Sequence, residues 1–176
     1  MSLSVFDLSN KTVVITGAAG GIGSATAHQL GGAGARLACS DIDHNALNRL
    51  KGELEAKGIK VTTYLSNSSI ESDVISLYES IKKDLGTPDI LVNNAGINMK
   101  KPFIEVSDAD FDHIITTNVQ SIFTISREVI KCMLPQKSGV IINISSMASQ
   151  YGLPKVIAYT ASKGGVLSMS RELGVQ

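Results

Sequence analysis

The sequence predicts an α/β fold in which a parallel sheet lies between two layers of helices, a three-layer αβα arrangement. Short apolar segments alternate with helical segments along the whole chain, and the first apolar segment runs directly into a cluster of glycines. Right-handed crossovers between successive strands give a doubly wound sheet with strand order 3-2-1-4-5. A chain of 176 residues is most simply one domain, so we expect residues 1–176 to form a single unit.

The first strand and helix are predicted within residues 12–33, TVVITGAAGGIGSATAHQLGGA. Val13–Ile15 is a short apolar run of the kind found in a buried parallel strand. Glycines after such a strand allow a sharp turn and let a pyrophosphate approach the main chain, where the N–H groups of the next helix face its charge. This order is typical of a Rossmann-type dinucleotide-binding unit, although a purely structural turn is the alternative. The glycines are Gly17, Gly20, Gly21 and Gly23.

The second strand is predicted at residues 36–40, and it ends at Asp41. An acid at this place can accept hydrogen bonds from both ribose hydroxyls of NAD, whereas it repels the 2′-phosphate of NADP. We therefore expect NAD as the cofactor, with NADP less favoured. A solvated loop acid or a helix cap is the alternative role for Asp41.

The remaining segments continue the alternation of helices and strands. Ser107 and Asp110 have the spacing of a capping box that begins a long helix. The carboxyl ends of parallel strands meet at one edge of the sheet, where ligands bind. The glycine turn, Asp41, residues 93–96 and Ser145–Ser146 all follow strands, which predicts one shared site. The expected helices are 46–57, 70–85, 107–134 and 157 onward, the expected strands are 60–65, 89–92 and 139–144, and 145–155 is a loop.

Tyr159 and Lys163 lie four residues apart on the last predicted helix, so they share one face. A nearby ammonium favours the phenolate form of a tyrosine, which can then exchange a proton with an alcohol or a carbonyl oxygen. Ser146 follows a strand and could hold the substrate oxygen. Asn118 lies in mid-helix and needs hydrogen-bond partners if buried, for which an ordered water is a candidate. Each residue also has an ordinary structural alternative. Tyr159 and Lys163 could be a chance pair on a helix, Ser146 a loop residue, and Asn118 an amide whose hydrogen bonds are satisfied within the fold.

Taken together, these motifs resemble those of the short-chain dehydrogenase/reductase family. The resemblance implies an oxidoreductase that passes hydride between a secondary alcohol or ketone and a nicotinamide cofactor. It implies Tyr159 as general acid/base, Lys163 on the nicotinamide ribose, and Ser146 as the residue that orients the substrate. It further implies that Asn118 supports a relay water. The matching residues are Thr16-Gly17-x-x-x-Gly21-Ile22-Gly23, Asn93-Asn94-Ala95-Gly96, Asn118, Ser146 and Tyr159-x-x-x-Lys163.

The same resemblance implies which residues contact the cofactor and which substrates are acted on. Asn67 stands where the family usually has an aspartate that touches adenine, and its amide could make that contact. Residues 98–103 and 146–152 are similar to those of gluconate 5-dehydrogenase-like and 3-oxoacyl-carrier-protein reductase-like members. Lys100 and Lys101 could attract an anionic substrate, or could simply be solvated. The expected cofactor-binding residues are Thr16, Gly17, Gly21, Ile22, Gly23, Asp41, Asn67, Asn94, Ala95, Gly96, Tyr159 and Lys163.

Composition argues against several other classes of protein. Sixteen basic and sixteen acidic residues balance, so no electrostatic footprint indicates nucleic acid or an anionic membrane as a partner. Cys39 and Cys132 form neither a disulfide framework nor a metal-binding spacing, so no metal is expected. No apolar run is long enough for a membrane span, and no signal-peptide pattern begins the chain. We therefore expect a cytoplasmic protein.

The resemblance also implies segments beyond the tyrosine helix. Family members continue into a sixth and a seventh strand with substrate-covering helices, whereas this sequence ends at Gln176. We therefore expect either a C-terminally truncated dehydrogenase with its nucleotide half-site intact, or a catalytically defective chain that at most binds the nucleotide. Residues 139–144 would then be an apolar edge strand.

Oligomerisation is a further implication, because family members pair two long helices in homodimers or homotetramers. The apolar face that could serve this pairing, and equally packing on the sheet, consists of Ile114, Ile115, Ile122 and Ile125.

Overall fold

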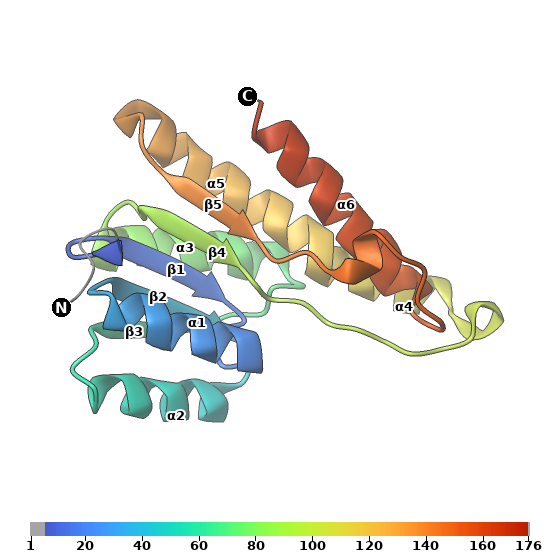
Figure 1. Cartoon of the computed structure of the whole chain (residues 1–176), viewed down its shortest axis with the longest axis horizontal. Coiled ribbons are helices and arrows are strands. Elements are labelled where there is room, and N and C mark those ends of the chain that lie inside the picture. Colours follow the sequence, from blue (N-terminus) through green and yellow to red (C-terminus); the bar gives the residue numbers. More distant parts are fainter. Residues whose placement is uncertain (1–5, 176) are drawn as a thin grey trace.

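Residues 6–175 are described by the computed structural model, in which a parallel sheet is sandwiched between helices (Figure 1). The sheet has the order β3-β2-β1-β4-β5, and each neighbouring pair is parallel, which confirms the predicted topology. Val14 of the central strand pairs with Ala38 on one side and with Leu91 on the other. The strands are Thr12–Thr16 (β1), Arg36–Asp41 (β2), Val61–Leu65 (β3), Ile90–Asn93 (β4) and Val140–Asn143 (β5).

The helices cover both faces of the sheet (Figure 1). Helices α1 and α2 pack on one face, while α3 and α5 pack on the other. Helix α6 lies against β5, α4 and the turn that joins α4 to α5. None of the helices between residues 6 and 175 has the length and apolarity needed to cross a bilayer. The helices are Gly21–Gly32 (α1), His44–Glu55 (α2), Glu71–Leu85 (α3), Asp108–Ile115 (α4), Ser121–Gln136 (α5) and Ile157–Leu173 (α6).

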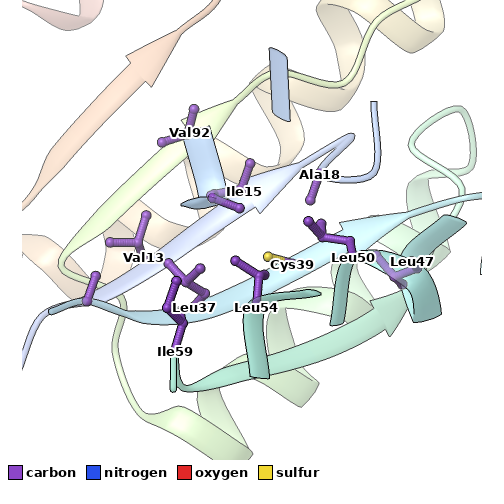
Figure 2. Packing of buried hydrophobic residues seen from close by; sticks show 12 residues of the cluster. Val13, Ile15, Ala18, Leu37, Cys39, Leu47, Leu50, Leu54, Ile59 and Val92 are labelled. Atoms are coloured by element: carbon purple, nitrogen blue, oxygen red, sulfur yellow. The ribbon is translucent and has the colours of Figure 1, made fainter. Parts of the chain in front are cut away.

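Two apolar cores lie on opposite faces of the sheet. Successive strand side chains point to opposite faces, so a strand that is covered on both sides is apolar throughout. Val13 and Ile15 of β1 therefore belong to one cluster, with Leu54 of α2 (Figure 2), whereas Val14 belongs to the other, with Ile81 of α3. This double coverage explains why the strands could be predicted from short continuous apolar runs.

The predicted long helix at 107–134 is interrupted. The capping box forms as expected: the Ser107 hydroxyl accepts the Asp110 N–H, and the Asp110 carboxylate accepts the Ser107 N–H. Between α4 and α5, however, Thr116–Gln120 forms a π-helical turn. Such a turn inserts one residue into the helix and is often found at functional sites. The prediction of one uninterrupted α-helix was wrong at this point, and Asn118 lies within the turn.

The other predicted elements occur within two residues of their expected bounds. Helix α2 begins two residues early because the Asp43 side chain caps it, accepting the Ala46 N–H at 2.9 Å. The loop after β5 contains a short 3₁₀ turn at Met147–Ser149. Ile125, one of the four isoleucines on the apolar face that could serve oligomerisation, is buried in the core between α5 and the sheet. Packing within the chain therefore explains why this position is apolar.

Candidate nucleotide-binding and catalytic site

A cleft of about 780 Å³ opens at the carboxyl ends of the strands. Its walls come from the glycine loop, the residues that follow each strand, the end of α4 with the π turn, and the first turns of α6. Thr16, Gly23, Asn118 and Ser146 are outside its lining. The structure thus gathers most of the predicted site residues in one place, namely Gly17, Gly21, Ile22, Asp41, Asn67, Asn94, Ala95, Gly96, Tyr159 and Lys163.

The glycine loop packs too tightly for side chains at two of its positions. Gly17 has a φ of +62°, and a Cβ there would lie 2.8 Å from the Ala95 Cα. A Cβ on Gly23 would overlap the Gly17 carbonyl oxygen. Gly21 is different, because a Cβ there would meet nothing within 4 Å and the residue lines the cleft. Gly17 and Gly23 therefore shape the loop, whereas Gly21 keeps the cleft open.

The start of α1 offers free hydrogen-bond donors to the cleft. Its N-cap is Gly20, which contributes no side-chain hydrogen bond, and the first turn contains no acidic residue. The first N–H groups of a helix lack partners within the helix, and the helix dipole favours an anion beside them. Gly20, Gly21 and Ile22 line the cleft, so this end of α1 fits a pyrophosphate.

Thr16 and Asn94 join the glycine loop to the loop after β4. The Thr16 hydroxyl accepts the N–H groups of Asn94 and Ala95, both at 3.1 Å. The Asn94 amide donates to the carbonyls of Thr16 and Gly17 at 3.0 and 2.9 Å. Thr16 thus contributes from outside the cleft lining, because it helps to hold the glycine loop and the loop after β4 together as one wall of the cleft.

Asp41 and Asn67 line the opposite part of the cleft. The two carboxylate oxygens of Asp41 accept the N–H groups of Ala19 at 2.9 Å and Asp43 at 3.1 Å. Each oxygen retains a further lone pair, so acceptance of ribose hydroxyls stays compatible with these bonds. The Asn67 side-chain oxygen accepts from the N–H and the hydroxyl of Ser69, which fixes its position beside the cleft.

Tyr159 and Lys163 project from α6 into the same cleft. The Lys163 Nζ lies 5.8 Å from the centre of the Tyr159 ring and donates a 2.7 Å hydrogen bond to the Ile144 carbonyl. Only 3% of Lys163 is exposed, and burial lowers its pKa below that of an ordinary lysine. The arrangement places a buried cation beside a phenol.

Asn118 is fully buried in the π turn. Its amide donates to the Ile97 carbonyl at 2.9 Å and to the Ser162 hydroxyl at 3.0 Å, and its oxygen accepts the Ile97 N–H at 2.8 Å. Both amide protons are therefore used by the protein itself. The group nevertheless lies near the lysine: a Cβ on Gly96 would be 3.3 Å from Asn118 Oδ1 and 3.5 Å from Lys163 Nζ.

The two serines after β5 occupy different places. Ser145 lines the cleft, and its hydroxyl donates to the Lys163 carbonyl at 3.0 Å. The Ser146 hydroxyl accepts the Ala148 N–H at 3.1 Å and so caps the short turn that follows. The sequence singled out Ser146 but did not predict that Ser145 would hydrogen-bond the main chain of α6. It also did not predict the role of Ser162, whose position directly before Lys163 was the only indication in the sequence.

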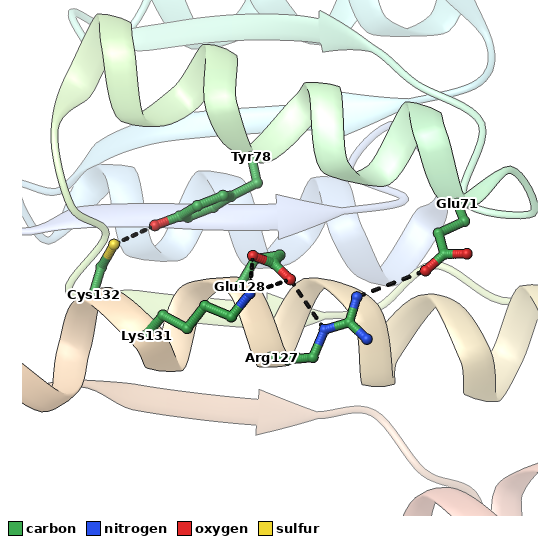
Figure 3. A network of polar contacts seen from close by, with 6 residues as sticks. All are labelled: Glu71, Tyr78, Arg127, Glu128, Lys131 and Cys132. Atoms are coloured by element: carbon green, nitrogen blue, oxygen red, sulfur yellow. Dashed lines mark hydrogen bonds and ion pairs between the residues drawn. The ribbon is translucent and has the colours of Figure 1, made fainter.

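The cysteines lie outside the cleft. Cys39 is buried in the core, where desolvation raises its pKa to about 12. Cys132 accepts the Tyr78 hydroxyl between α3 and α5, beside the ion pairs of Arg127 with Glu71 and Glu128 (Figure 3). Within residues 6–175 no group of three or more His, Cys, Asp or Glu side chains could hold a metal ion.

Comparison with known proteins finds relatives that match nearly the whole chain. Residues 11–176 match the sequence profile of the family described as short chain dehydrogenase. The chain is 35% identical to a 2-dehydro-3-deoxy-D-gluconate 5-dehydrogenase of Formosa agariphila over an alignment of 177 positions, which covers 100% of this chain and 67% of that protein.

Solved structures share the fold at comparable identity. NAD⁺-bound xylitol dehydrogenase superposes with a TM-score of 0.91 at 32% identity, covering 96% of this chain and 65% of that one. A metagenomic short-chain oxidoreductase in complex with NADP also gives a TM-score of 0.91 at 32% identity, covering 94% of this chain and 76% of that one. The chain therefore belongs to the short-chain dehydrogenase family of NAD(P)-dependent oxidoreductases.

Proposed function

We propose that this chain carries the site of an NAD-dependent dehydrogenase that interconverts a secondary alcohol and a ketone. One observation carries the proposal: a single cleft contains both the uncapped start of α1 and the Tyr159–Lys163 pair of α6. The first feature suits the phosphates of a dinucleotide, and the second suits proton transfer at a substrate oxygen.

The residues along the cleft fit a dinucleotide from end to end. The N–H groups around Gly21 would hold the pyrophosphate, with Ile22 beside it. Asp41 would accept the adenosine ribose hydroxyls, and Asn67 would meet the adenine. Asn94, Ala95 and Gly96 form the wall next to Lys163, where the nicotinamide end would lie. When bound, the nicotinamide supplies or accepts the hydride.

The side chains of the chain manage the proton of the reaction. In the oxidation direction, the Tyr159 phenolate takes the alcohol proton, and in the reduction direction the phenol returns it to the carbonyl oxygen. The buried Lys163 ammonium would favour the phenolate and would donate to the nicotinamide ribose. Ser146 would hydrogen-bond the substrate oxygen, for which its hydroxyl still has its proton to donate. Asn118 would support the water that passes the proton onward by accepting a hydrogen bond from it, because both amide protons are already donated within the protein.

Asp41 favours NAD over NADP. Its carboxylate lies at the end of β2 and lines the cleft where the adenosine ribose would bind. A 2′-phosphate there would meet a negative charge, whereas two hydroxyls would meet two acceptors. Solved relatives with NAD and with NADP both exist, so the preference rests on this residue of the chain.

The substrate is proposed to be a polyhydroxylated acid or a related polyol. The Formosa agariphila relative is named for a deoxy sugar acid, which carries a carboxylate. Lys101 is held by Asp110 at 2.6 Å, whereas no ion pair engages the exposed Lys100 among the residues that the structure describes. Lys100 is therefore the better candidate to attract an anionic substrate.

The test is a turnover assay on the purified chain with NAD or NADH and a panel of sugar acids, polyols and their keto forms. Cofactor-linked turnover that Tyr159→Phe abolishes supports the proposal. Cofactor binding without turnover on any member favours the alternative, a chain that only binds the nucleotide. Sizing of the same sample tests the proposed homodimer or homotetramer, and cell fractionation tests the cytoplasmic location.

A further inference from the structure

Helix α6 is joined to the rest of the molecule by two asparagine–serine hydrogen bonds, one of them buried and the other partly buried. In the first, the fully buried Ser162 hydroxyl accepts the Asn118 amide at 3.0 Å and donates to the Tyr159 carbonyl at 2.7 Å. In the second, the Ser170 hydroxyl accepts the Asn143 amide at 2.9 Å and donates to the Val166 carbonyl at 2.7 Å. The two pairs are chemically alike but hold different parts of the fold.

The first pair connects the segments that build the catalytic end of the cleft. Asn118 is bound on its other side to the main chain of Ile97, directly after the wall formed by residues 94–96. Ser162 is therefore the last member of a series of hydrogen bonds that connects the loop after β4, through Asn118 of the π turn, to the helix that carries Tyr159 and Lys163. The second pair joins α6 to β5, two turns beyond Lys163.

We propose that Ser162 is a positioning residue that sets where Lys163 and Tyr159 stand relative to the π turn. The space around the Lys163 ammonium is narrow, since it contacts the Ile144 carbonyl at 2.7 Å and faces Gly96. A small shift of α6 would break that contact, and misplacement of about 1 Å near a reacting centre can cost a hundredfold in rate. Without Ser162 an Asn118 amide proton also loses its acceptor in the interior.

The role rests on the function proposed above, because the position of the pair matters only for a reaction at Tyr159. Its test therefore begins with a measurement that needs no turnover. Competitive amine labelling across a pH series, followed by peptide mass spectrometry, reports the accessibility and the pKa of Lys163 in the cofactor-free chain. Ser162→Ala is compared with Ser170→Ala, which removes the matched hydroxyl from the same helix.

The labelling pKa of Lys163 should rise toward that of an exposed lysine in Ser162→Ala and stay unchanged in Ser170→Ala. Where the wild-type chain turns over, kcat should fall by about tenfold to a hundredfold in Ser162→Ala with little change in KM for NAD. Ser162→Cys keeps the size and a weak hydrogen-bonding group, so it should give intermediate values, and it replaces the alanine variant if that one does not fold.

Equal labelling of Lys163 in the wild type and in the Ser162 variants would overturn the positioning role, as would equal effects of the two alanine substitutions. A wild-type chain without turnover would count against the proposed function alone, since the labelling comparison is independent of it.

Discussion

The Asp41 carboxylate accepts the main-chain N–H of Ala19 at 2.9 Å, which joins the end of β2 to the glycine loop. Its other oxygen accepts the N–H of Asp43. The residue that is expected to choose between NAD and NADP therefore also anchors, by a hydrogen bond, the loop that would hold the pyrophosphate. These two roles can be separated by substitution.

Asp41→Asn should change the cofactor preference while keeping the loop. An asparagine oxygen can still accept the Ala19 N–H, but the charge that repels a 2′-phosphate is gone. The ratio of NAD affinity to NADP affinity should fall by about tenfold or more. Asp41→Ala, which also loses the loop contact, should weaken both cofactors. Competition titrations measure the ratio, and an unaltered ratio in Asp41→Asn would rule out Asp41 as the selector.

Tyr159→Phe should abolish proton transfer without disturbing the cleft, because only the hydroxyl is removed. We expect turnover to fall by about a hundredfold to ten-thousandfold, with the Kd for NAD unchanged. Tyr64→Phe is the control, since its hydroxyl donates to Asp84 outside the cleft. Turnover and calorimetric titrations provide the two measurements. A Tyr159→Phe chain with wild-type turnover would refute the assignment.

Lys163→Met should abolish turnover and alter the pH dependence of stability. Burial lowers the pKa of Lys163 from its ordinary value of 10.5. The unfolded chain thus keeps this proton to higher pH than the folded chain, so wild-type stability gains as pH rises from the lowered pKa toward 10.5. The methionine variant lacks this gain. Urea titrations should show wild type improving relative to Lys163→Met across that window, and a constant difference would contradict the burial of a charged lysine.

Asp110→Asn should remove an acid-sensitive contribution to stability. The hydrogen bond from Lys101, followed by that from the Ser107 N–H, lowers the pKa of Asp110 from 3.8 to about 2. A carboxylate with a lowered pKa stabilises the fold above its ordinary pKa, and this contribution is lost as pH falls toward 2. Urea midpoints should therefore differ from wild type at neutral pH and converge near pH 2. Asp112→Asn, exposed on the same helix, is the control, and a difference that persists in acid would argue against this account.

The strands of the sheet and the glycine loop could be predicted because each is encoded by residues that are close together in the sequence. Val13, Val14 and Ile15 form a continuous apolar run because both faces of β1 are covered. The Ser107–Asp110 capping box acts over three residues and was found for the same reason. In a parallel sheet the carboxyl ends of all strands lie at the same edge, so the separate motifs that follow the strands predicted one shared cleft.

The details that sequence reasoning missed depend on contacts between distant segments. The π turn around Asn118 leaves no mark on the apolar spacing of the helix, so an uninterrupted helix was expected. The partners of the Asn118 amide, Ile97 and Ser162, are 21 and 44 residues away in the chain. Likewise, which of Ser145 and Ser146 faces the cleft is decided by the backbone after β5.

The most direct test of the account asks whether the start of α1 binds the dinucleotide. A Cβ on Gly21 would meet nothing within 4 Å and would lie at the cleft, and a Cβ on Gly32, at the other end of α1, would also meet nothing within 4 Å but lies outside the cleft. Thermal melts of wild type, Gly21→Val and Gly32→Val should match without cofactor.

Titration with NAD and NADP then separates the outcomes. NAD should raise the Tm of wild type and Gly32→Val more than NADP does, because a ligand stabilises the state that binds it, and should leave Gly21→Val unchanged. An equal rise in all three chains, or no rise in any, would contradict the central claim that this cleft is a nucleotide site.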